Sequence, residues 1–204
     1  MKKIMVTMSA MAIFVMSSTA VANGTQWELT LGVGHSTADT QLSITPSGEQ
    51  LHIVSLDDSG ISINTNIAYL FDKHWYVSAG YLDLGNASVT LTADTLQAGT
   101  LKQELTNIGP VLGNGFTLSA GHKFWVSENI ALDLQLGLFN WKAELTSTFD
   151  NNTIATDDTG TDLFLSVGAR YQVSERWAIS TNWQRFQLSD TDVDNINIAL
   201  SYAF

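Results

Sequence analysis

The stretch Ile130–Leu138, IALDLQLGL, decides the fold because its residues alternate between two chemical classes. Every second residue from Ile130 onward is isoleucine or leucine, and the residues between them are alanine, aspartate, glutamine and glycine. A period of two places each class on its own face of an extended chain, whereas an amphipathic helix needs a period of about 3.6. The stretch is therefore predicted to be a β-strand with one apolar face.

The same alternation recurs in seven other stretches, so eight strands of about 9–11 residues are predicted, the length that a tilted membrane-crossing strand requires. The other seven are approximately Trp27–His35, Ile61–Phe71, Trp75–Gly85, Phe116–Trp125, Leu163–Gln172, Trp177–Gln187 and Asn195–Phe204. A closed barrel leaves no strand edge unpaired, as a bilayer demands. The sequence therefore predicts an all-β fold, an eight-stranded antiparallel up-and-down transmembrane β-barrel.

The two faces of these strands favour an apolar exterior. One face is leucine, isoleucine, valine and aromatic residues, and the other carries glycines and small polar residues that suit the narrow interior of an eight-stranded barrel. Charged residues make up 14% of the chain, against roughly 25% in soluble domains. A soluble β-barrel with its apolar face inside is the alternative.

The N-terminus has the features of a cleaved secretory signal. Two lysines precede an apolar run that ends near Met16, and Ala20 and Ala22 have the A-x-A spacing that a signal peptidase reads. The run is shorter than the ~20 residues that a membrane-spanning helix needs. We expect residues 1–22 to be removed and residues 23–204 to form one barrel domain.

Short and long connections are predicted to alternate around the barrel. Three short polar segments are tight turns between antiparallel strands, and they fall on the periplasmic side if the N-terminus lies there. They are Asp72-Lys73-His74, Ser127-Glu128-Asn129 and Ser174-Glu175-Arg176. The long connections, predicted to be extracellular loops, are residues 36–60, 86–114, 141–162 and 187–194.

Aromatic residues lie on the outward parity of these strands and are predicted to form a girdle at the lipid–water boundary, where amphipathic rings are most stable. The girdle residues are Trp75, Phe124, Tyr171, Trp177 and Tyr202, with Trp183 included on a parity that a bulge would change. Ordinary hairpin aromatics in a soluble core are the alternative.

The negative charge of the chain is concentrated in the predicted loops. Loss of the signal would leave 7 of the 9 Lys and Arg residues against 20 Asp and Glu, a net charge of −13. The loops hold 14 acidic residues and two lysines. Such a surface disfavours nucleic acid and favours cations or an extracellular ligand with a basic patch. Acidic loops that only keep the surface solvated are the alternative.

Three segments resemble the OmpA-like outer-membrane β-barrel family. They are GYLDLGNASVTL (Gly80–Leu91), RWAISTNWQRF (Arg176–Phe186) and the terminal NIALSYAF (Asn197–Phe204). The resemblance implies the outer membrane of a Gram-negative bacterium, with outer-membrane lipid and lipopolysaccharide as neighbours. It also implies periplasmic chaperones and a barrel assembly machinery that recognises a C-terminal aromatic signature, here Tyr202 and Phe204.

Larger members of this family continue into a periplasmic peptidoglycan-binding domain. This chain stops at Phe204, so only the barrel domain is expected. Alternation persists in NASVTLTADTLQ (Asn86–Gln97), so some strands are expected to project beyond the membrane, as in the related OmpX-type barrels.

Four charged residues share the inward parity and a similar depth in the inner half of the barrel: Glu28, Lys123, Asp133 and Arg170. Buried charges avoid a heavy desolvation cost only when they are paired, and an eight-stranded barrel is just wide enough for its side chains to fill it. We predict an ionic network that closes the lumen, bordered by Gln135 and Gln184. Separate hydration of each charge in a wet interior is the alternative.

Arg185 has outward parity near the outer end of its strand. A guanidinium at this level could pair bidentately with a lipopolysaccharide phosphate, and bonding to acidic loops is the alternative.

Catalytic, metal and cofactor sites are not expected. The chain has no cysteine and no metal-binding or phosphate-binding motif, and its histidines are His35, His52, His74 and His122. The sequence predicts a small outer-membrane barrel with a structural or surface-interaction (adhesion-type) role. A passive narrow channel for ions or small solutes, and a lipid A-modifying or proteolytic enzyme, are the alternatives.

Overall fold

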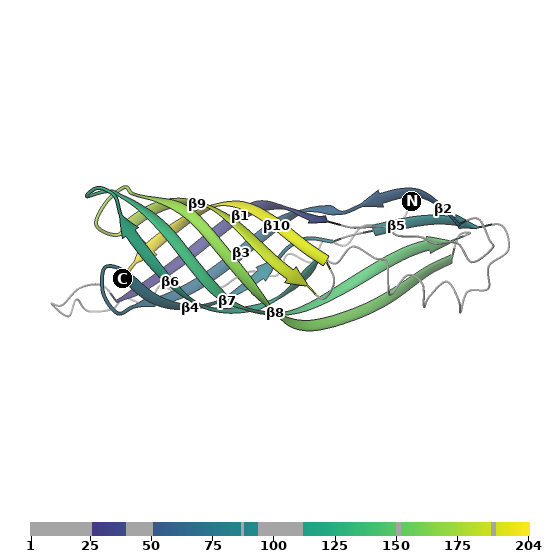
Figure 1. Cartoon of the computed structure of the whole chain (residues 1–204), viewed down its shortest axis with the longest axis horizontal. Coiled ribbons are helices and arrows are strands. Elements are labelled where there is room, and N and C mark those ends of the chain that lie inside the picture. Colours follow the sequence, from purple (N-terminus) through teal and green to yellow (C-terminus); the bar gives the residue numbers. More distant parts are fainter. Residues whose placement is uncertain (1–25, 40–50, 87, 94–111, 150–151, 189–190) are drawn as a thin grey trace, which may run out of the picture.

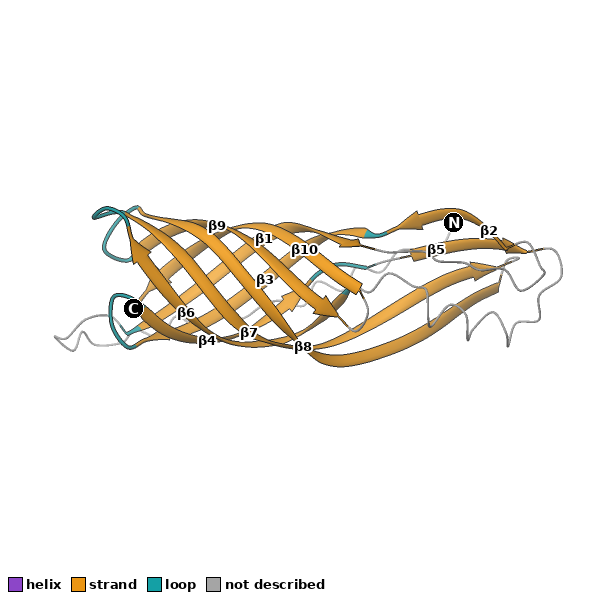
Figure 2. Cartoon of the chain, in the orientation of Figure 1, coloured by secondary structure: helices purple, strands orange, loops and turns teal. Residues whose placement is uncertain are grey.

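The computed structural model of the chain describes residues 26–39, 51–86, 88–93, 112–149, 152–188 and 191–204. The predicted signal peptide, residues 1–22, lies outside these ranges. Within them, no helix is both long and apolar enough to cross a membrane. Figure 2 shows a chain of strands joined by turns and loops.

Eight strands close into a barrel (Figure 1). They are β1 (Trp27–Asp39), β3 (Ser59–Leu70), β4 (Trp75–Asp83), β6 (Gly113–Trp125), β7 (Ile130–Phe149), β8 (Asn152–Gln172), β9 (Trp177–Leu188) and β10 (Thr191–Ala203). Each pairs antiparallel with the next barrel strand along the chain, and the pairing of β10 with β1 closes the ring. The predicted eight-stranded antiparallel barrel is confirmed.

The apolar face of the barrel points outward, as the alternation predicts. On β7, Leu132, Leu134 and Leu136 are exposed, whereas the intervening Asp133 and Gln135 point into the barrel and are partly buried. Leucines on the outside of a soluble protein would lose the free energy of burial, but against lipid acyl chains they do not. The exterior is therefore built to face hydrocarbon.

Strands extend past one end of the barrel, which we call the hairpin end (Figure 1). There β2 (Leu51–Asp57) pairs antiparallel with β5 (Ser88–Ala93), and β5 runs parallel to the outer part of β7. The opposite end, where the short connections lie, is called the turn end.

The predicted loop boundaries are wrong in extent. Most of 141–162 is strand, because β7 runs to Phe149 and pairs with β8 from Asn152. Predicted loop 36–60 contains the end of β1, all of β2 and the start of β3, and 187–194 contains the end of β9 and the start of β10. Outside lipid a strand needs no continuous apolar face, so polar residues there do not mark the end of pairing. The projection expected from Asn86–Gln97 is present as β5.

The three short turns share one hydrogen-bonding pattern. In each, the residue before the polar segment donates its backbone N–H to the first residue of the next strand, as in Val126 to Ile130 (2.9 Å) and Val173 to Trp177 (2.9 Å). The first polar side chain then accepts the N–H three residues on: Ser127 Oγ from Ile130 and Ser174 Oγ from Trp177, both at 3.2 Å. A repeated sequence motif thus gives a repeated turn.

Asp72 plays this part in the first turn and accepts two bonds, from the N–H groups of His74 (2.6 Å) and Trp75 (2.8 Å). These donations, from Trp75 first and then His74, hold the pKa of the Asp72 carboxyl below its ordinary value of 3.8. Because the folded-state pKa is lowered, the charged carboxylate stabilises the turn fully above pH 3.8 and loses this effect as the pH falls through the lowered value.

Replacing Asp72 with alanine is expected to lower the free energy of unfolding at neutral pH, and Asp72→Asn to lower it less, because the amide keeps an oxygen acceptor. The difference between wild type and Asp72→Asn should vanish in strong acid. Urea unfolding in detergent micelles, followed by tryptophan fluorescence, measures both differences. A wild-type advantage over Asp72→Asn that is the same at neutral pH and in strong acid would contradict the assignment.

Candidate functional site: the barrel interior

A buried ion-pair cluster crosses the lumen near the turn end. Arg170 of β8 donates from Nη1 to Oε1 of Glu28 (2.7 Å) and from Nη2 to Oε2 (2.6 Å), and Lys123 Nζ of β6 lies 3.4 Å from Oε2. The three side chains are only 4–7% exposed. Strands β9 and β10 lie between β1 and β8, and strands β3 and β4 lie between β1 and β6. The Glu28 carboxylate therefore joins three separate parts of the wall.

Tyr76 and Asp133 extend this cluster. Asp133 is the cross-strand neighbour of Lys123, and its Oδ1 accepts a hydrogen bond from the Tyr76 hydroxyl at 2.6 Å. The Lys123 ammonium lies 5.0 Å from the centre of the Tyr76 ring, a cation–π distance. A Cβ at position 121 would overlap the Tyr76 ring, so Gly121 makes the room for it.

The four charged residues of the predicted network thus lie in one region, but Asp133 is tied to it through Tyr76. The sequence analysis did not include Tyr76 among the interior residues. Its opposite parity to Trp75 was the available signal. Two acids and two bases make the cluster neutral, so the cost of burying each charge is offset by its partners.

Amides and hydroxyls fill the next level of the lumen. Gln135 donates to Ser119 Oγ (2.6 Å) and Ser78 Oγ (3.0 Å). On the other side of the lumen, Gln184 Oε1 accepts from Asn195 (2.8 Å) and Asn197 (2.9 Å). Gln135 and Gln184 are therefore held by neutral hydroxyl and amide groups.

The interior at the hairpin end is apolar, which the sequence analysis did not expect. The rings of Phe139, Phe164 and Phe186 meet there, with Phe186 5.2 Å from Phe139 and 5.1 Å from Phe164 between ring centres. We call this group the apolar cap: Ala38, Leu82, Leu84, Leu112, Phe139, Trp141, Ala143, Phe164, Phe186, Leu188 and Val193. The expectation of a polar interior is wrong at this level. The sequence feature that could have predicted this is the presence of aromatic residues on the inward parity. Phe186, which directly follows the outward Arg185, is an example.

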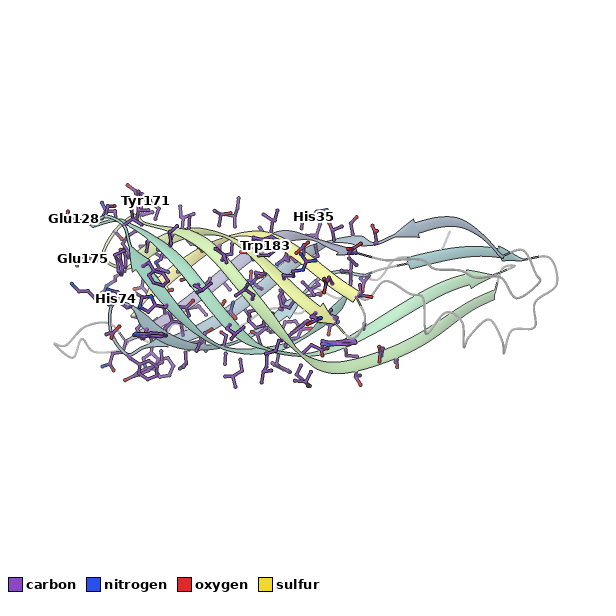
Figure 3. The ribbon with its side chains drawn as sticks, in the orientation of Figure 1. His35, His74, Glu128, Tyr171, Glu175 and Trp183 are labelled. Atoms are coloured by element: carbon purple, nitrogen blue, oxygen red, sulfur yellow. The ribbon has the colours of Figure 1, made fainter. Side chains whose placement is uncertain are left out.

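Aromatic side chains ring the outside of the turn end. Trp75, Phe124, Tyr171 and Trp177 are all about half exposed and point away from the lumen. The Tyr202 ring packs against Trp177 at 4.7 Å and stacks on the C-terminal Phe204 at 6.3 Å. Figure 3 labels Tyr171 at this end, beside the turn residues His74, Glu128 and Glu175.

Trp183 lies at a different level from this ring. It pairs with Ile196, whereas Trp177 pairs with Tyr202, so Trp183 is six residues nearer the hairpin end (Figure 3). Trp27 and Phe71, which were not predicted, are also exposed at the turn end, and both contact Tyr69.

Arg185 lies on the outer surface near the hairpin end. Its guanidinium donates to Asp192 Oδ2 at 2.8 Å and lies 3.9 Å from Asp194 Oδ2. Both carboxylates belong to the adjacent strand β10. In the described part of the chain, no group of three or more His, Cys, Asp or Glu side chains is placed to hold a metal ion.

The closed antiparallel barrel, its exposed leucines and its paired interior define a transmembrane β-barrel protein. Residues 6–204 match the family of the outer membrane protein beta-barrel domain, and the chain belongs to this family. No individual curated protein matches the sequence. The protein is thus placed in the outer membrane of Gram-negative bacteria. Barrels of this membrane have short periplasmic turns and longer extracellular loops, which puts the turn end in the periplasm and the hairpin end outside.

Several solved structures are similar to the chain at low sequence identity. Neisserial surface protein A is 10% identical, with a TM-score of 0.53, over 87% of this chain and 97% of its own. The N-terminal barrel of OprF from Pseudomonas aeruginosa is 11% identical, with a TM-score of 0.52, over 89% and 100%. Ail of Yersinia pestis is 15% identical, with a TM-score of 0.48, over 88% and 99%.

Arg170→Ala is expected to destabilise the barrel by ~3–5 kcal/mol, because it leaves the buried Glu28 carboxylate without its bidentate partner. Urea unfolding in micelles measures the loss. The matched control is Arg176→Ala, which removes an exposed turn arginine whose Nη1 lies 3.3 Å from the Tyr202 hydroxyl. Equal losses for the two variants would show that the buried pair has no special weight.

Proposed function

We propose that this outer-membrane barrel is closed at rest and has a structural or surface-interaction (adhesion-type) role. The observation that carries the proposal is the Glu28 carboxylate, which receives Arg170 and Lys123 from distant parts of the barrel wall. Side chains bound to one another across the lumen fill its cross-section. The paired charges are also unavailable to a permeating ion.

The hairpin end supplies the surface for interaction. Asp157 and Asp158 are exposed on the outer part of β8, and Lys142 lies 3.6 Å from Asp157 across the β7–β8 pair. With Asp192 and Asp194 around Arg185, the described surface at this end has more acidic than basic groups. This balance favours a partner with a basic patch. The other predicted loop acids lie partly outside the described residues.

The three histidines His35, His74 and His122 support a non-enzymatic role. His74 is in a turn beside Asp72, and His122 is stacked on it at 5.6 Å and packs against Trp75 on the outer side. His35 is exposed on the outer face of β1. All three side chains point away from the lumen. The lumen is the part of the barrel in which a catalytic site could exclude water.

The C-terminus supports an assembly role for Tyr202 and Phe204. Tyr202 lies in β10, the strand that closes the barrel on β1, and the N–H of Phe204 donates to the carbonyl of Trp27 at 2.9 Å. The edge of β10 is accessible to the assembly machinery only before β10 pairs with β1, so a recognition signal on this strand would act before the barrel closes.

Purified protein in planar bilayers is expected to show little or no steady conductance, because its lumen is filled. Each preparation is checked for folding by its heat-modifiable migration on gels. A large and steady conductance from the folded wild-type protein would overturn the closed-barrel proposal and support the passive channel.

Arg185→Ala is expected to reduce the lipopolysaccharide bound per barrel in detergent, if the guanidinium reaches a phosphate beside Asp192 and Asp194. Arg185→Lys should restore only part of the binding, because an ammonium lacks the bidentate geometry of a guanidinium. If Arg185→Ala binds as much lipopolysaccharide as the wild type, the guanidinium interacts only with Asp192 and Asp194.

A further inference from the structure

The inward side chains form three levels between the turn end and the hairpin end. On β8 the inward residues change from Arg170 in the ion-pair cluster, through Ser166 at a polar level, to Phe164 in the apolar cap. The inward residues of β7 follow the same order: Asp133, Gln135 and Phe139. The cap is thus separated from the ion-pair cluster by the amides and hydroxyls.

The apolar cap is buried, and its members form one cluster of buried residues. Phe139, Phe186, Leu84, Leu188 and Val193 have no exposed surface. They come from three barrel strands, β7, β9 and β10, and from the segment directly after β4. Ala38 of β1 and Phe164 of β8 belong to the same cap, so walls on several sides of the lumen contribute to it. The Phe186 ring packs edge-on against Phe139 at 5.2 Å and stacks on Phe164 at 5.1 Å.

The one indole of the cap is satisfied from within the protein. Trp141 donates its ring N–H to Asp162 Oδ2 at 2.7 Å, and a Cβ at position 160 would overlap its ring. Gly160 therefore lets Trp141 lie flat against β8. Because its N–H is already hydrogen-bonded to Asp162, the Trp141 indole needs no water molecule as a partner.

We propose that the apolar cap is a second permeation barrier, which closes the extracellular end of the lumen independently of the Glu28 cluster. Apolar constrictions exclude ions because water inside them has no hydrogen-bonding partners. The polar level around Ser166 is then a compartment enclosed from both sides. This barrier does not depend on the surface-interaction role proposed above.

The absence of cysteine from the chain allows a direct test. Ser166→Cys places a single thiol between the two barriers, and a small charged methanethiosulfonate is added to either side of proteoliposomes. Thr159→Cys, at an exposed position on the projecting part of β8, reports which side is extracellular and serves as the labelling control.

The cap is opened by Phe139→Ala with Phe186→Ala, and the ion-pair cluster by Glu28→Ala with Arg170→Ala, which leaves Lys123 and Asp133 as neighbours. Opening the cap is expected to speed labelling at position 166 by more than about tenfold, only from the extracellular side. Opening the cluster should speed it only from the periplasmic side. Neither change should affect the control thiol.

Two results would overturn the proposal. One is extracellular labelling of position 166 that is as fast with the cap intact as with it opened. The other is steady conductance from the variant with only the cluster opened, while the wild type is closed. Wild-type conductance, by contrast, would contradict the closed lumen itself.

If the double alanine variant fails to fold, Phe186→Asn replaces it, because it makes the constriction polar with less loss of volume, and the same labelling is expected.

Discussion

A bilayer offers no hydrogen-bond partners to a polypeptide backbone, and the rest of this structure depends on that constraint. Every N–H and C=O in the hydrocarbon region must be paired within the protein, so a sheet is stable there only when its first and last strands meet. The β1–β10 pairing, twelve residues long from Glu28 with Ala203 to Asp39 with Asp192, satisfies this requirement. Closure then fixes an inside and an outside, and side-chain alternation assigns each residue to one of them.

Closure with eight strands also dictates what the inside contains. The lumen is about as wide as the side chains that line it, so the interior must be packed or hydrated, and charges in it must be matched. The chain meets these demands differently along the axis. A neutral ion-pair cluster lies near the turn end, hydrogen-bonded amides lie in the middle, and the apolar cap lies at the hairpin end. Each level satisfies its own members, so none relies on bulk water for stability.

Features set by local pattern were predictable from the sequence, and features set by convergence across the lumen were not. The leucine alternation of Ile130–Leu138 identified the outward face, and the repeated polar turn segments located the hairpins. The parity of Glu28 and Arg170 placed both charges inside, but it could not show that Asp133 would meet Tyr76. Phe139, Phe164 and Phe186 lie on different strands, and their contact depends on relative strand register, which a single sequence does not specify. Strand ends beyond the lipid were also hidden, because polar residues continue pairing there without an apolar face.

Register itself gives a physical reason for charges in a lumen that could have been apolar throughout. The outward leucines, isoleucines and valines are nearly interchangeable, so a strand that slips by two residues keeps its apolar face outward. Such a slip moves a side chain by about 7 Å along the strand. It would break the 2.6 and 2.7 Å bonds between Arg170 and Glu28, and it would leave two buried charges unpaired. Because Glu28 contacts β8 and β6 from β1, one carboxylate penalises slippage at several pairings of the barrel at once, which a layer of interchangeable apolar side chains does not do.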